Sequence, residues 1–160
     1  MMLLRLGILS LLLSLSACGF QLRGLSDFPQ QLSNIHLLVE NLDSGERALV
    51  TQALQRAGVS LVGAESSAVR LRVSFKTLAE RSLADSAGSG SRIVRLAREL
   101  NYSVIEANGN RLVDNDILTS TQDLEVNENN LLAVEGEKQV VLANITDNLV
   151  NQMLRQLQRL

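Results

Sequence analysis

The chain has 160 residues, of which 46% are hydrophobic, so it is the size of one domain with enough apolar side chains for one core. Its formal net charge is −2, from 15 Lys and Arg against 17 Asp and Glu, which gives no overall basic field for nucleic acid. With one His, one Cys and no Trp, it also lacks the residues that most catalytic sites and base-stacking surfaces use. We therefore expect a folded domain that binds no nucleic acid, metal or cofactor and is not an enzyme.

The first 17 residues have the organisation of a bacterial export signal, with Arg5 as the early positive charge and an apolar run over 6–15. That run is shorter than the roughly 20 apolar residues needed to span a bilayer, which favours a cleaved signal over a transmembrane helix. Residues 15–18, Leu-Ser-Ala-Cys, resemble a lipobox, in which the Cys thiol accepts a diacylglyceryl group and becomes the first mature residue. Cys18 is the predicted lipid anchor, and Gly19 in place of Asp favours the outer membrane.

A tether is predicted between the anchor and the folded domain. Residues 18–33 contain Gly24, the only proline (Pro29) and several polar residues, which is typical of an irregular or bound segment. The predicted domains are therefore a signal peptide over 1–17, a lipidated tether over 18–33 and a single domain over 34–160.

The domain begins with a short apolar strand over 35–40, followed by a helix over 44–57. Asp43, with Glu46 three residues later, matches the capping box that starts helices. A short strand over 59–62 is a possible lead-in to the rest of the sheet.

Three longer strands follow. Over 69–76 apolar residues alternate with basic ones, which indicates a half-buried strand with a basic outer face. A small, flexible Gly/Ser tip at 85–91 leads to a long strand over 92–107, and another strand covers 111–124. Asn108-Gly109 between them predicts a two-residue type I′ turn, because these residues tolerate positive φ.

A long helix is predicted over 133–160, after a polar loop at 127–130. Its apolar residues recur every three or four positions and form one stripe, which we assign to the core. The members of that stripe are Leu142, Ile145, Leu149, Met153 and Leu157. The order of elements is β-α-β-β-β-α, so we expect an α+β two-layer sandwich in which a mixed four-stranded sheet carries two helices on one face.

The residues that begin the mature chain, Cys18-Gly19-Phe20-Gln21-Leu22-Arg23-Gly24, resemble the start of the LPS-assembly lipoprotein family LptE, also called RlpB. The size of the chain and its order of elements are similar to that family as well. The resemblance implies an outer-membrane lipoprotein, not an enzyme, that sits as a plug inside the large β-barrel LptD and helps insert lipopolysaccharide into the outer leaflet. The protein would then lie on the periplasmic side or within the barrel lumen. The alternative is a generic periplasm-facing lipoprotein that scaffolds an envelope complex or binds a small ligand.

The resemblance also implies contact with lipopolysaccharide through basic residues near the hairpin tip. Seven basic residues lie between positions 70 and 98, opposed within that stretch only by Glu80 and Asp85. Arginine suits phosphate because its guanidinium forms paired, charge-assisted hydrogen bonds. Phosphate contact, pairing with carboxylates in the barrel and plain solvation all remain open. The candidates for lipopolysaccharide contact are Arg70, Arg72, Lys76, Arg81, Arg92 and Arg95, with Lys138 in the last helix as a weaker one.

Two other polar features point to no chemistry. His36 lies in the first strand without a carboxylate or Ser partner at a recognisable spacing, so we expect a packed or surface side chain. Asp114-Asn115-Asp116 lacks the Gly and terminal Glu of a calcium-binding loop and is interpreted as a polar strand entry.

Overall fold

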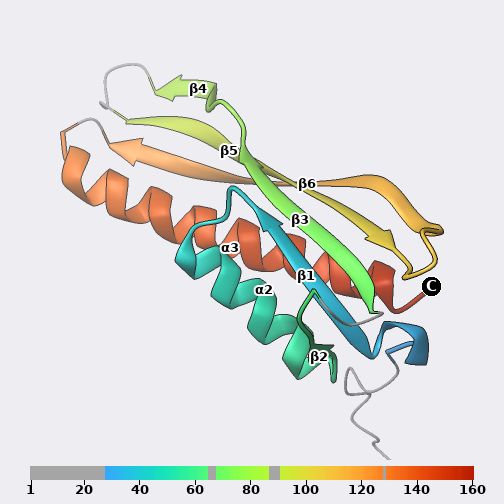
Figure 1. Cartoon of the computed structure of the whole chain (residues 1–160). Coiled ribbons are helices and arrows are strands. Elements are labelled where there is room, and N and C mark those ends of the chain that lie inside the picture. The colour runs from blue at the N-terminus through green and yellow to red at the C-terminus, as the bar shows by residue number, and fades with distance from the viewer. Residues whose placement is uncertain (1–27, 65–67, 87–90, 128) are drawn as a thin grey trace, which may run out of the picture.

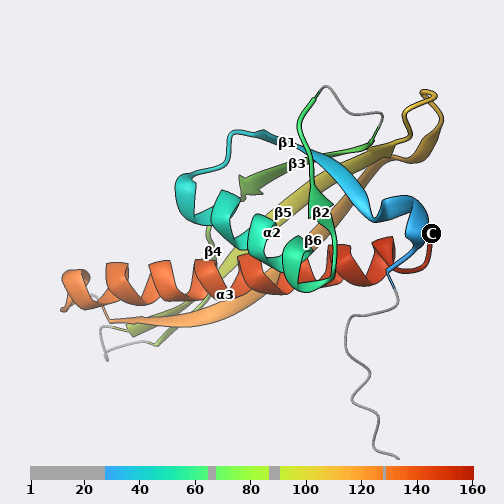
Figure 2. The ribbon, with the colours of Figure 1, turned by 60° about the horizontal axis from the view of Figure 1, so that its bottom comes forward.

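The computed structural model describes residues 28–64, 68–86, 91–127 and 129–160; the predicted signal, Cys18 and most of the tether lie outside these ranges. The elements in chain order are η1 (Gln30–Leu32), β1 (Asn34–Glu40), α2 (Ser44–Arg56), β2 (Ser60–Leu61), β3 (Val69–Thr77), β4 (Arg81–Ser86), β5 (Ser91–Ile105), β6 (Arg111–Asn127) and α3 (Leu131–Leu157). Both α-helices pack on the same face of one mixed sheet (Figures 1 and 2), so the predicted α+β two-layer fold is confirmed.

Within the described ranges the sheet has six strands rather than the predicted four. β1 pairs in parallel with β2 and β3, whereas β5 pairs in antiparallel with β3, β4 and β6. The two added strands are short: β2 has 2 residues and β4 has 6. β4 shows no clear alternation of apolar and polar residues, and its pairing with β5 shifts register between Ser82 and Ala84. Such a segment becomes a strand only because the first half of β5 lies beside it.

Helix α2 has the sequence signals expected at both ends. The Asp43 carboxylate accepts a hydrogen bond from the backbone N–H of Glu46 at 2.8 Å, and the Glu46 carboxylate accepts one from Asp43 N–H at 3.1 Å. At the other end Gly58 has φ +83°, and Val59 N–H donates to the Leu54 carbonyl. This is the Schellman arrangement, which requires a residue in the left-handed region and therefore favours glycine.

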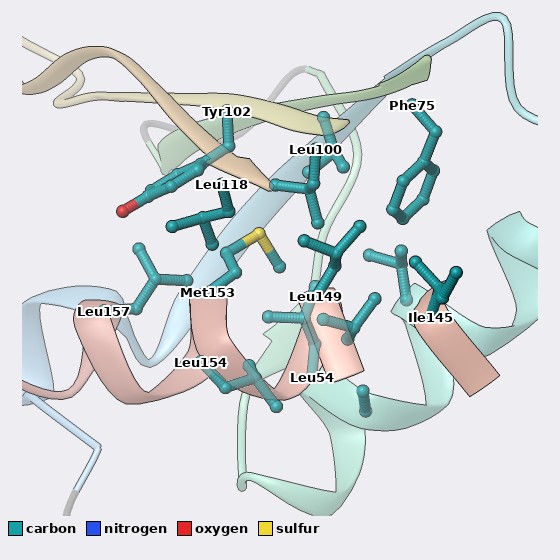
Figure 3. Close-up of a cluster of buried hydrophobic side chains, with 14 of the residues drawn as sticks. Leu54, Phe75, Leu100, Tyr102, Leu118, Ile145, Leu149, Met153, Leu154 and Leu157 are labelled. Carbon is teal, nitrogen blue, oxygen red and sulfur yellow. The ribbon is translucent and has the colours of Figure 1, made fainter. Parts of the chain in front are cut away.

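The core lies between the sheet and the two helices (Figure 3). The side chains of the strands that pack against α3 include Phe75, Leu100 and Tyr102. The predicted stripe on α3 is confirmed: Leu142 is half-buried and its other four members, Ile145, Leu149, Met153 and Leu157, are at most 2% exposed. Leu32 of η1 is fully buried, so the last residues of the predicted tether pack onto the domain. In the described part of the chain, no helix is both long and apolar enough to cross a membrane.

The hairpin between β5 and β6 differs from its prediction. Glu106 N–H donates to the Asn110 carbonyl at 2.8 Å, and Gly109 N–H donates to the Glu106 carbonyl at 2.9 Å. Gly109 has φ +89°, but Asn41 is the one described residue other than glycine with positive φ, so Asn108 does not have the conformation of a type I′ turn. The loop therefore has three residues, with the glycine alone in the left-handed region, which is the next commonest hairpin geometry.

Candidate functional site

Five of the predicted contact residues lie on the face of the sheet that the helices leave uncovered. Arg70, Arg72 and Lys76 of β3 are exposed and alternate with the buried residues of that strand. Arg95 of β5 is exposed on the same face, and Arg81 of β4 lies directly opposite it. Residues directly opposite each other in an antiparallel pair share a face of the sheet. We call this surface, defined by these five residues, the outer face.

The outer face does not gather these residues into one cluster. Arg70 is in register with Ile105 of β5, and Lys76 with Glu99, whereas Arg81 is in register with Arg95. Ile105, opposite Arg70, and Arg95, opposite Arg81, are ten residues apart on β5, which corresponds to roughly 33 Å along the strand. The structure brings Arg81 and Arg95 together and spreads the other basic residues along a line.

Acidic residues from other strands lie among the basic ones. Arg72 forms an ion pair with Glu40 of β1 at 3.4 Å. Arg95 donates to both carboxylate oxygens of Asp123 on β6, at 2.7 and 2.9 Å. The surface predicted to be basic from residues 70–98 is therefore partly balanced in charge, because the sheet places next to it carboxylates that are distant in the sequence.

The ion pair between Arg95 and Asp123 shifts the pKa of both groups in the direction that favours their charged forms. The hydrogen bond from Arg95 lowers the pKa of the Asp123 carboxyl, and the hydrogen bond to Asp123 raises the pKa of Arg95. Both groups are on the surface, so solvent screens the interaction. The pair keeps its charges at neutral pH and holds the Arg95 guanidinium against β6.

Among the described residues, three basic residues of the outer face form no ion pair: Arg70, Lys76 and Arg81, of which only Lys76 is in register with a carboxylate, Glu99. Arg70 is in register with His36 and Ile105, and Arg81 with Arg95. Like charges directly opposite each other destabilise a sheet, so the juxtaposition of Arg81 and Arg95 favours binding of an external anion.

Arg92 and Lys138 do not belong to the outer face. Arg92 alternates in phase with buried Val94 and lies opposite buried Val126, so it points to the helix side of the sheet and is half-buried. The Lys138 ammonium donates to the Glu80 carboxylate at 2.7 Å, which ties α3 to the connection between β3 and β4. The place of Arg92 between residues 70 and 98 predicts that it joins the others, although the alternation of β5 already puts it in phase with the buried Leu96 and Leu100.

One polar cluster on the helix side was not singled out from the sequence. The Arg98 guanidinium donates to Glu46 of α2, Thr146 of α3 and Thr77 of β3, and it lies over the Phe75 ring at 5.2 Å from the centroid. The sequence of β5 does indicate this position, because Arg98 has the same strand alternation as the buried Leu96 and Leu100 and therefore lies on the helix side. A cation at such a position implies a buried partner.

A cavity of about 480 Å³ adjoins this cluster, between the start of α2 and the middle of α3. Leu49, Leu142 and Ala143 form its apolar part, and Arg98 and Glu46 its charged part. The Arg98 donors are directed at Thr77, Thr146 and Glu46, so the cluster joins the sheet to both helices. The Arg98 guanidinium is therefore bound within the protein and is not directed at the cavity as a ligand-binding group.

His36 and the Asp114–Asp116 segment occupy structural positions. His36 Nδ1 lies 3.1 Å from the Val62 carbonyl, next to the edge of the sheet. Asp114 forms an ion pair with Arg111, whereas Asp116 contacts the hydroxyl of Tyr102 at 3.1 Å. Among the residues that the structure describes, no group of His, Cys, Asp and Glu is placed to hold a metal ion.

No protein-family model and no curated protein matches the sequence. Solved structures do match over most of the chain. A minor lipoprotein from Acinetobacter baumannii is similar with a TM-score of 0.64 and 16% identity, over 80% of this chain and 94% of that one. Rare lipoprotein B from Shewanella oneidensis has a TM-score of 0.66 and 14% identity, over 77% and 92% of the two chains.

An uncharacterized lipoprotein B from Nitrosomonas europaea gives a TM-score of 0.66 and 20% identity, over 88% of this chain and 90% of that one. The described elements thus cover nearly the whole length of each of these proteins. At these identities the likeness establishes the architecture and not the activity. This chain has the fold of these solved bacterial lipoproteins.

Proposed function

We propose that this protein is an outer-membrane lipoprotein, anchored through Cys18, that acts as plug and assembly partner of the LptD β-barrel and helps insert lipopolysaccharide into the outer leaflet. Two features support the proposal together. The residues at 18–24 resemble the start of the LptE family, and the fold is shared with rare lipoprotein B from Shewanella oneidensis. Neither feature calls for catalysis.

The observation that carries the proposal is the polar, uncovered outer face. Between its basic residues lie Ser74, Asn101, Thr119 and Thr121, all of them half-buried or exposed and none of them charged. The interior of a large membrane barrel is polar and is often filled by a plug. A polar surface of this kind suits contact with such a wall: Arg72 and Arg95 bring their own carboxylate partners, and the unpaired Arg70, Lys76 and Arg81 would be matched by anionic groups of the wall or of lipopolysaccharide.

The shape of the domain agrees with this role. The 15 residues of β5 extend over roughly 50 Å, and β6 runs beside them for the whole length. η1 and the C-terminus lie at one end of this long sandwich, whereas the pairing of β4 with β5 lies at the other (Figure 1). Arg81 and Arg95 belong to the β4–β5 end, away from η1, and they are our proposed pair for a phosphate of lipopolysaccharide.

The proposal is tested by purifying the affinity-tagged, lipidated protein from membranes in mild detergent. A stoichiometric large β-barrel is the expected partner, and depletion of the protein is expected to reduce surface lipopolysaccharide. Recovery of peptidoglycan-linked or inner-membrane partners instead, with surface lipopolysaccharide undiminished, would show a general envelope scaffold. The variant Cys18→Ala is the matched control for anchoring, because it removes the predicted acylation site and should release the chain from the membrane fraction.

A further inference from the structure

The long edge of β6 has no neighbour in the described part of the chain. β6 comprises 17 residues, and β5 is the only described strand with which it pairs. An unpaired strand edge presents a row of free N–H and C=O groups and therefore pairs readily with another extended chain.

The backbone of β6 can be oriented residue by residue. Leu78, which follows β3, donates its N–H to the Ala97 carbonyl of β5 at 3.0 Å, so the carbonyl of Ala97 points toward β3. The N–H and C=O of one strand residue point to the same side, so Ala97 does not bond to Thr121, its neighbour in register on β6. The polar backbone groups of Thr121 therefore point to the open edge, and by alternation so do those of Thr119 and Asp123. Those of Leu118, Ser120 and Gln122 bond to β5.

The middle of this edge carries none of the usual obstacles to pairing. Residues 117–122 are Ile-Leu-Thr-Ser-Thr-Gln, without charge, proline or glycine, and Ile117 is 52% exposed. Natural edges are commonly protected by a charge, a proline or a bulge. The register shifts between β5 and β6 lie near Val104, away from this segment. A run of this length and composition has the character of a segment that adds to a sheet.

We propose that the edge of β6 at residues 117–123 binds an extended segment of a partner protein, which adds to the sheet as a further strand. Charge determines the kind of segment. Asp116 lies before the uncharged run and Glu125 after it, and among the described residues neither forms an ion pair, whereas Asp114 and Asp123 are paired with Arg111 and Arg95. The complementary partner strand is uncharged in its middle and basic at both ends.

A second copy of this chain is the less suitable occupant. With Asp114 and Asp123 paired to Arg111 and Arg95, β6 keeps the charges of Asp116 and Glu125, so two β6 edges would oppose strands of the same negative charge. The edge site uses the backbone groups of Thr119 and Thr121, whereas the outer face presents their side chains, and the site stands whether or not the partner of the protein is LptD. Failure of the barrel purification would leave it untouched.

The first experiment measures backbone amide exchange in the full lipidated chain in detergent, with and without a blocked synthetic peptide, Lys-Thr-Val-Thr-Val-Thr-Lys. Without peptide, the amides of Thr119, Thr121 and Asp123 should exchange fast and those of Ser120 and Gln122 slowly. With peptide, the exchange of the first three should slow by about tenfold or more, since each gains a main-chain hydrogen bond. The same peptide with Glu in place of both Lys residues should protect them less.

The second experiment compares two variants at one position. Thr121→Pro removes the outward N–H and leaves the hydrogen bonds to β5 in place, whereas Thr121→Val keeps the N–H. We expect the peptide to bind the proline variant about tenfold more weakly and the valine variant as it binds the unsubstituted chain.

Three outcomes would overturn the site. They are equal binding by both variants, no protection of the outward amides by the peptide, and protection of those amides by raised protein concentration alone, which would identify a second copy as the occupant. The exchange pattern of the unsubstituted chain decides the matter even where the proline variant does not fold.

Discussion

The guanidinium of Arg98 on β5 donates to the carboxylate of Glu46, which is the residue that completes the capping box of α2 with Asp43. The side chains of the pair are only 15% and 9% exposed. One ion pair thus connects the middle of the sheet to the start of a helix, and Thr146 of α3 shares the same guanidinium. A buried pair of this kind positions the layers, and it is costly to break on one side only.

Arg98→Ala is expected to lower the free energy of unfolding by about 3 kcal/mol, because it leaves the Glu46 carboxylate buried without its cation. Urea unfolding followed by circular dichroism measures the loss. The double variant Arg98→Met with Glu46→Gln should lose less than Arg98→Ala alone, since no charge is then left unpaired. Arg95→Ala is the control, because its pair with Asp123 is exposed, and a loss as large as that of Arg98→Ala would contradict the assignment.

Tyr102 makes stability depend on pH in the alkaline range. Burial raises the pKa of its hydroxyl well above the ordinary value, with a further contribution from the hydrogen bond to Asp116. An unfolded chain releases this proton near pH 10. The stability that the neutral hydroxyl contributes is therefore fully present below about pH 10 and is lost as the pH rises above it.

The measurement is unfolding by urea between pH 8 and pH 11 in the unsubstituted chain and in Tyr102→Phe. The variant should be less stable by about 1 kcal/mol at neutral pH, because the hydroxyl also contacts Gln156. It should lose stability less steeply above pH 10 than the unsubstituted chain. Parallel curves for the two proteins would show that Tyr102 does not resist ionisation.

Two exposed glycines should respond to alanine with opposite signs. Gly109 has φ +89°, where a side chain is strained, so Gly109→Ala should destabilise the protein by about 1 kcal/mol. Gly136 lies within α3 and a Cβ there would meet nothing within 4 Å, so Gly136→Ala should stabilise it by about 0.5 to 1 kcal/mol. Thermal melting of both variants checks the pair. Equal signs would contradict the three-residue hairpin or the helix.

Asp123 competes with any external anion for Arg95. Asp123→Asn removes that competition and should raise the affinity of the purified protein for lipopolysaccharide a few-fold, if Arg95 contacts its phosphates as proposed. Charge reversal by Arg95→Glu should lower the affinity. Asp114→Asn is the control, because it releases Arg111 outside the proposed contact pair. Unchanged binding in both Asp123→Asn and Arg95→Glu would exclude Arg95 from the contact.

Much of the fold is visible in local patterns. The alternation that predicts β3, the apolar stripe of α3 and the capping box at Asp43 all hold in the structure. Each of these signals depends on residues within a few positions of one another, because strand and helix periods repeat over that distance. The Asn108-Gly109 pair predicts the turn at the right place but the wrong type, since neighbouring bulges in the β5–β6 pairing help to set the loop length.

The candidate site is where sequence and structure diverge. Counting charges along residues 70–98 predicts a basic surface, yet the sheet register brings Glu40 beside Arg72 and Asp123 onto Arg95. The alternation of β5 places Arg92 on the helix side of the sheet and Arg98 between the sheet and the helices, so neither belongs to the outer face.

Local sequence patterns were enough for both helices, the longer strands and the α+β class, and they are the basis of the predicted anchor at Cys18 and the resemblance at residues 18–24, but they did not indicate β4. Only the tertiary structure decided which charges are paired, which strand edge is open and which basic residues lie without a carboxylate beside them. The physical reason is that a local period fixes the face of a side chain within its own element. Its neighbours across the sheet, which set its net charge and its free hydrogen-bonding groups, come from segments tens of residues away.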